Sequence, residues 1–139
     1  MANRSLHSGY ILGLDVGEKR IGVAVASVIA RLPQPVETIT VDASTLERIG
    51  RLVKEKKATL IVIGIPRNLE GNETPQSREI REFAAQLQEA INVPIEFADE
   101  SLSSVRADSA HHQVHFRNAS RDSLAACFIL QEFLGTIKR

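Results

Sequence analysis

The pattern of apolar and polar positions predicts strands in the first third of the chain. Two apolar, β-prone runs, residues 10–16 and 20–27, flank the short connection GEK, whose length and leading glycine are typical of a β-hairpin. A third strand is expected at 36–41, after the strand breakers Pro33 and Pro35. Because these strands follow one another closely along the chain, they are expected to form an antiparallel meander.

Helical spacing alternates with two further strands in the rest of the chain. The run TLIVIGI, residues 59–65, is apolar on both faces and predicts a strand covered on both sides. The segment VPIEFA, residues 93–98, predicts a fifth strand. A short helix is expected at 103–112, and a last one from near Ser120 to about Leu134. Apolar residues recur every three or four positions, as in amphipathic helices, within 42–57 (Leu46, Ile49 and Val53) and after Pro75 (Ile80, Phe83, Ala84, Leu87 and Ile91).

Strands that alternate with helices after an initial hairpin predict an α/β fold. The last two strands are expected to join the sheet through helical crossovers, which gives a five-stranded mixed sheet with helices on both faces. The sequence contains no internal repeat, low-complexity stretch or linker. Residues 1–139 are therefore expected to form one domain, with 1–9 as a flexible N-terminal extension.

Composition and charge narrow the functional classes. No run approaches the ~18 apolar residues that a membrane helix needs, and the first ten residues lack the apolar core of a signal peptide. The single cysteine, Cys127, excludes a disulfide framework and is expected to be a buried, inert thiol, so a cytoplasmic location is expected. The 17 basic residues balance 17 acidic ones, so any nucleic-acid site must be a local patch.

Acidic residues stand at the ends of predicted elements, where sites in α/β sheets gather. Asp15 interrupts the apolar run of the first strand, although a buried, unpaired carboxylate is costly. Asp99 and Glu100 follow the fifth strand, and Asp122 lies in the first turn of the last helix. Taken singly, Asp122 is equally explained as a helix N-terminal acid, and the other pair as ordinary strand-exit residues. Together they suggest a site for a hard divalent cation, since Mg²⁺ is held by one or two carboxylates with waters and substrate phosphate.

A polar loop supplies a second candidate, for phosphate binding. The segment PRNLEGNETPQS follows a buried strand and leads into a helix N-terminus, whose free N–H groups favour phosphate. Arg67 can grip phosphate with two hydrogen bonds, and Asn68, Thr74 and Ser77 are suitable hydrogen-bonding groups. Without the acids, a capped surface loop explains this segment equally well. The remaining predicted substrate contacts are a turn glycine and a basic rim beside the acids: Gly17, Lys19, Arg20, Arg117 and Arg121.

Four motifs, LGLDVGEKRIGVA, VIGIPRNLEGNET, DESLSS and DSLAACFILQEFL, resemble in order and spacing those of the YqgF (RuvX) family of bacterial proteins, over nearly the whole chain. The resemblance implies an RNase H-like fold related to Holliday-junction resolvases, and a function in 5′-end maturation of pre-16S ribosomal RNA. It also implies a catalytic, metal-binding triad of Asp15, Glu100 and Asp122, with Mg²⁺ or Mn²⁺ as the metal. Arg67 and Asn68 become candidates for substrate contact.

The chain departs from the family pattern at three places. Ser101 stands where the family usually has arginine, Ala26-Ser27-Val28 lacks the acid that commonly follows the first hairpin, and HFRNASRD replaces a lysine-rich approach to the last helix. The implied triad is retained, so these departures concern the grip on the substrate and leave the metal site unchanged.

Several functions are compatible with these observations. The leading hypothesis is a metal-dependent nuclease that hydrolyses phosphodiester bonds in structured RNA, with a possible association with the ribosome. A Holliday-junction resolvase acting on branched DNA is the alternative, and it would require a homodimer. A non-catalytic nucleic-acid-binding module of the same fold is a third possibility. Sugar kinases, actin and chaperone ATPases also begin with a strand bearing Asp-x-Gly, but they need two such domains to enclose a nucleotide.

Overall fold

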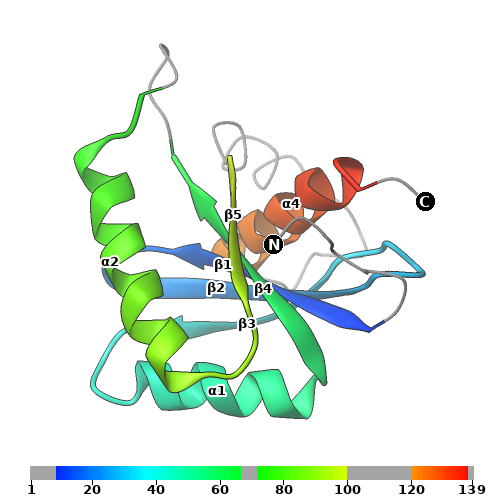
Figure 1. The fold of residues 1–139 in the computed structure, drawn as a ribbon, viewed down its shortest axis with the longest axis horizontal. Coiled ribbons are helices and arrows are strands. Elements are labelled where there is room, and N and C mark those ends of the chain that lie inside the picture. The colour runs from blue at the N-terminus through cyan, green and yellow to red at the C-terminus, as the bar shows by residue number, and fades with distance from the viewer. Residues whose placement is uncertain (1–8, 67–71, 100–119, 138–139) are drawn as a thin grey trace.

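The computed structural model describes residues 9–66, 72–99 and 120–137 of the chain (Figure 1). Every strand expected from the sequence is present, as are the long helices. The expected helix at 103–112 lies outside the described residues. The strands are β1 (Tyr10–Val16), β2 (Arg20–Ser27), β3 (Gln34–Thr40), β4 (Ala58–Ile65) and β5 (Ile95–Asp99), and the helices are α1 (Thr45–Glu55), α2 (Pro75–Ala90) and α4 (Arg121–Gly135). Within the described ranges, no helix is long and apolar enough to cross a membrane.

The sheet is mixed, and its strand order is β3-β2-β1-β4-β5. β1, β2 and β3 are antiparallel neighbours, whereas β4 and β5 run parallel to β1. The expected meander and the two helical crossovers are therefore confirmed. The prediction for β3 was wrong at its start, because the strand already includes Gln34 and Pro35. β3 lies at an edge of the sheet, where proline is tolerated, and the β2–β3 register shifts beside it, between Val23 and Ala24.

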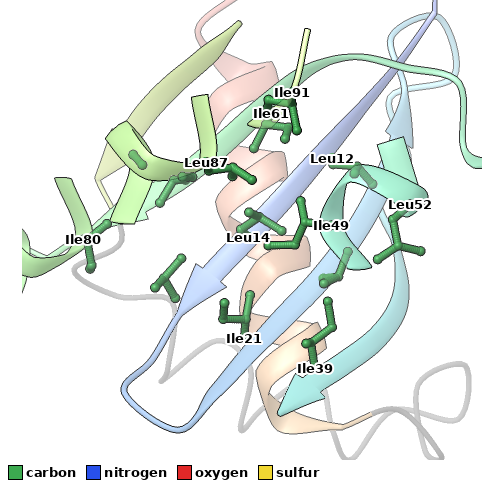
Figure 2. Packing of buried hydrophobic residues seen from close by; sticks show 14 of the residues in the cluster. Leu12, Leu14, Ile21, Ile39, Ile49, Leu52, Ile61, Ile80, Leu87 and Ile91 are labelled. Atoms are coloured by element: carbon green, nitrogen blue, oxygen red, sulfur yellow. The ribbon is translucent and has the colours of Figure 1, made fainter. Parts of the chain in front are cut away.

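Helices cover both faces of the sheet, as the sequence predicted. The side chains of Leu12 and Leu14 pack with α1 and α2, and Figure 2 shows this layer, with Ile49 and Leu87 pointing toward the strands. Ile11 points to the opposite face and packs with residues of α4, including Ile129. Successive side chains of a strand point to opposite faces, so the position of each residue along β1 decides which helices it meets.

Helix α4 lies close to the sheet at two glycines, where an added side chain would collide with it. A Cβ at Gly13 would lie 2.5 Å from Cγ of Leu130, and one at Gly22 would lie 1.9 Å from the backbone oxygen of Asp122. Leu130 near the end of α4 thus sits over β1 at Gly13, while Asp122 in the first turn sits over β2 at Gly22. The N-terminus of α4 is therefore directed toward the β1–β2 turn.

Candidate metal and nucleic-acid site

The C-terminal ends of three parallel strands meet at one edge of the sheet. β1 carries Asp15 next to its last residue, β5 ends at Asp99, and β4 ends at Ile65, which pairs with Asp99. Glu100, the second member of the expected triad, follows Asp99 and lies outside the described residues. The topology therefore places Asp15 and Asp99, the last described residue of β5, at the same end of the sheet.

Asp15 lies on the face of the sheet that α4 covers. Ile11 and Gly13 contact α4, and Leu12 and Leu14 point to the other face, so the alternation along β1 directs Asp15 toward α4 as well. The residue is half-buried, whereas its neighbours Leu14 and Val16 are buried. The carboxylate thus lies at the boundary between the core and solvent.

A lateral row of three residues places the first turn of α4 beside Asp15. Asp15 pairs with Gly22 across the β1–β2 ladder, and Gly22 pairs with Thr38 across the β2–β3 ladder. Asp122 rests on Gly22, the central member of this row. Since paired residues of antiparallel strands lie about 5 Å apart between Cα atoms, Asp15 and Asp122 are brought to neighbouring positions from opposite ends of the chain.

Hydrogen bonds fix the first turn of α4 over this row. Ser120 is the N-cap, and its hydroxyl accepts from the backbone N–H of Ser123 at 3.0 Å and donates to the Ser123 hydroxyl at 2.8 Å. The Ser120 hydroxyl also meets that of Thr38. Because the Ser120 proton is already directed to Ser123, Thr38 is the donor in that contact. The cap therefore ties α4 to the edge strand β3 and fixes the position of Asp122.

Arg20, a predicted substrate contact, is paired with Asp122 in this structure. Its Nε donates to Oδ2 of Asp122 at 3.0 Å, and the two side chains are 63% and 33% exposed. Arg20 precedes Gly22 by two positions, so both lie on the α4 face of β2. The sequence placed these residues 102 positions apart in separate motifs, and only the fold brings them into contact.

The other predicted contacts near Arg20 and Asp122 are Gly17, Lys19 and Arg121. Gly17 closes the turn, since its N–H donates to the backbone oxygen of Arg20 at 2.8 Å and an added Cβ would lie 2.7 Å from that oxygen. Lys19 is exposed in the same turn, and Arg121 is exposed at the first residue of α4. Lys19 and Arg121 are thus exposed cationic residues next in sequence to Arg20 and Asp122.

The polar loop before α2 is described only at its two ends. Arg67 and Asn68 lie outside the described residues. Thr74 caps α2 and forms a reciprocal capping box with Ser77. Ser77 has no exposed surface, and its hydroxyl meets the backbone oxygen of Pro66 at the end of β4. A side chain without exposed surface cannot reach a substrate, so this geometry gives Ser77 a structural function in place of the expected substrate contact.

The residues at the edge suit a hard divalent cation. Asp15 and Asp122 supply carboxylate oxygens, which Mg²⁺ prefers, and one or two carboxylates with waters are its usual protein ligands. A Cβ at Gly22 would push the backbone of Asp122 away from β2, so glycine at this position is what allows the first turn of α4 to lie beside Asp15. In the ranges 9–66, 72–99 and 120–137, no three His, Cys, Asp or Glu residues form such a group, and Glu100 falls outside those ranges.

A separate pocket of about 390 Å³ lies beside the same turn, on the other face of the sheet. Its walls include Val16, Ile21 and Ile80, which belong to the core layer under α1 and α2. Two glutamates, Glu18 and Glu79, also line it. Because Asp15 points to the α4 face, this pocket is not part of the carboxylate site.

The polar support of the site could not be identified in the sequence. Thr38 lies in a strand of mixed composition, where threonine is common, so its contact with Ser120 has no local signal. Ser120 precedes the last helix in the position of a capping residue, and that feature alone was readable.

Proteins from other organisms are similar in sequence to this chain over most of its length. A relative from Chloroflexus aggregans is 38% identical over 130 residues, covering 89% of this chain and 92% of its own length. One from Gloeobacter violaceus is 41% identical over 128 residues, covering 89% of this chain and 82% of its own. Both bear the name "Putative pre-16S rRNA nuclease".

Solved structures of low sequence identity share the fold. RuvC of T. thermophilus, in complex with a Holliday junction substrate, matches with a TM-score of 0.61 at 12% identity, covering 91% of this chain and 94% of that one. The Holliday junction resolvase of fowlpox virus matches with a TM-score of 0.59 at 10% identity, covering 92% and 99%. Residues 9–136 match the family described as "RuvX: Holliday junction resolvase". The chain therefore belongs to the RuvX (YqgF) family.

Proposed function

We propose that this protein is a metal-dependent nuclease that hydrolyses phosphodiester bonds during 5′-end processing of pre-16S ribosomal RNA. The observation that carries the proposal is the meeting of Asp15 and Asp122 at the carboxyl edge of the sheet, with Gly22 between them. We propose RNA as the substrate because both relatives are named as pre-16S rRNA nucleases. Asp15, Asp122 and Glu100 are the proposed ligands of Mg²⁺ or Mn²⁺.

The chain's own residues account for binding and orientation. The carboxylates would hold the cation at the end of β1, and the α4 cap keeps Asp122 over Gly22. Lys19 and Arg121, which are exposed, are proposed to contact phosphates of the substrate, and Arg67 and Asn68 of the loop after β4 are proposed to extend this contact. When bound, a divalent cation lowers the pKa of a coordinated water and stabilises the leaving oxygen of a phosphodiester.

Asp15→Asn tests the proposal with the fold intact. We expect wild-type protein with Mn²⁺ to cleave an RNA carrying the pre-16S 5′ region, and the variant to lose that cleavage and the metal's effect on thermal unfolding. Glu89→Gln, an exposed change on α2, serves as the control and should keep both. Cleavage that persists in Asp15→Asn, or in excess chelator, would refute the metal site.

A second function, resolution of four-way DNA junctions, is favoured by the description of the family. It differs in requiring two sites presented by a homodimer. The same assay with a four-way DNA junction in place of RNA separates the two functions, and sedimentation of the protein alone tests the dimer. Binding of either substrate without cleavage under all metal conditions would indicate a non-catalytic nucleic-acid-binding module.

A further inference from the structure

The ion pair between Arg20 and Asp122 presents a conflict within the proposed site. The Asp122 carboxylate is a proposed metal ligand, yet one of its oxygens already accepts a hydrogen bond from Arg20 at 3.0 Å. The other oxygen, Oδ1, could meet a cation, but the guanidinium and a divalent cation would then share one carboxylate and repel each other. Metal binding therefore favours loss of the contact between Arg20 and Asp122.

The environment of the pair makes Arg20 the partner that moves. Asp122 belongs to the first turn of α4, whose backbone rests on Gly22 and whose cap is held by hydrogen bonds. Arg20 is 63% exposed at the first residue of β2, with a long side chain that can turn toward solvent. Exposed ion pairs contribute little free energy to stability, so breaking this one costs little free energy.

We propose that Arg20 is a positioning residue that exchanges partners. It holds the Asp122 carboxylate in place while no divalent cation is bound, and on metal binding it is released to a phosphate of the substrate. This inference rests on the proposed function. It adds a coupling between metal and substrate, because the same cation that displaces Arg20 from Asp122 makes its guanidinium available to RNA. Thermodynamic linkage requires that coupling to be equal in both directions.

Calorimetric titration of Mn²⁺ in the absence of RNA tests the first half of the exchange. We expect Arg20→Gln to bind Mn²⁺ up to about fivefold more tightly than the wild type, since the competing cation is gone. The matched control is Arg48→Gln, which removes a half-buried arginine of α1 paired with Glu37 at 3.5 Å, away from the site. It should leave Mn²⁺ affinity unchanged. Equal or weaker Mn²⁺ binding by Arg20→Gln would overturn the exchange.

The sign of the change separates exchange from ordinary structural support. A purely structural Arg20 would lose folding stability and metal affinity together on substitution, whereas exchange predicts a gain in metal affinity. Asp122→Asn distinguishes the two proposals. If it weakens Mn²⁺ binding while Arg20→Gln has no effect, only the exchange fails. If it has no effect either, the metal site and the exchange both fail.

RNA binding tests the second half. With a pre-16S 5′ fragment kept intact in Ca²⁺, we expect Arg20→Gln to bind about fivefold more weakly than the wild type, as for loss of one charge-assisted phosphate contact. In excess chelator the two proteins should bind alike, because Arg20 is then engaged by Asp122. An equal loss in both conditions would refute the release step, since Arg20 would then contact RNA whether or not metal is present.

Discussion

Substitution of Gly22 by alanine is the most direct test of how the site is assembled. A Cβ at this position would lie 1.9 Å from the backbone oxygen of Asp122, where ordinary contact begins at 3.4 Å, a shortfall of 1.5 Å. The obstacle is backbone, which cannot turn aside as a flexible side chain can. The first turn of α4 must therefore lift away from β2.

The expected loss of stability follows from the contacts that this movement of α4 would break. Overpacking of this size costs about 1–3 kcal/mol, and loss of the hydroxyl contact between Thr38 and Ser120 adds about 1 kcal/mol. We therefore expect Gly22→Ala to lower the free energy of unfolding by about 2–4 kcal/mol. Because Asp122 moves away from Asp15, Mn²⁺ affinity should fall as well.

Urea denaturation followed by circular dichroism measures the first effect, and calorimetric titration of Mn²⁺ measures the second. Gly50→Ala is the matched control: Gly50 lies within α1, and its added Cβ would meet only Ile91 Cγ2, at 4.0 Å. That change should raise stability by about 0.5–1 kcal/mol, since alanine favours helices. A Gly22→Ala protein with wild-type stability, or with reduced stability and unchanged Mn²⁺ affinity, would refute this account of the site.

Two further predictions concern buried polar groups. Ser77→Ala should lower the free energy of unfolding by about 1–3 kcal/mol, because it removes the Ser77 half of the capping box with Thr74 and leaves the Pro66 carbonyl without its donor; urea denaturation measures this, and an unchanged midpoint would contradict it. Burial raises the pKa of the Cys127 thiol to about 12, so little thiolate exists at pH 8. A thiol reagent should therefore label Cys127 rapidly in urea and very slowly in native protein, and fast native labelling would show that the thiol is accessible.

The sheet was predictable because its signals are local. Apolar runs bounded by turns fix β1, β2 and β4, and glycine after Val16 marks the hairpin. The start of β3 could not be predicted, because proline at position 35 is acceptable in a strand only if that strand lies at the edge of the sheet. Strand position in a sheet depends on distant partners, which spacing along the chain does not encode.

The candidate site was predictable to the extent that its members violate local expectation. Asp15 is conspicuous because it interrupts an apolar strand. The contacts around Asp15 could not be predicted in the same way. The ion pair of Arg20 with Asp122, for example, joins residues that are 102 positions apart in the sequence. Ser77 was assigned to the substrate for its hydroxyl, but helix capping and the return to Pro66 consume that hydroxyl. A polar side chain in a loop sequence can satisfy the backbone as readily as a ligand.

The position at which α4 begins explains how β1 tolerates Asp15. The helix covers the α4 face of the sheet at Gly13 but has reached its first turn by Gly22, so coverage ends at the row that contains Asp15. The carboxylate therefore stays half-buried and faces a helix N-terminus, whose partial positive charge favours an anion. A helix starting one turn earlier would bury Asp15 further, and one starting a turn later would remove Asp122 from Gly22. The Ser120 cap, held against β3, thus determines how deeply Asp15 is buried and how far it lies from Asp122.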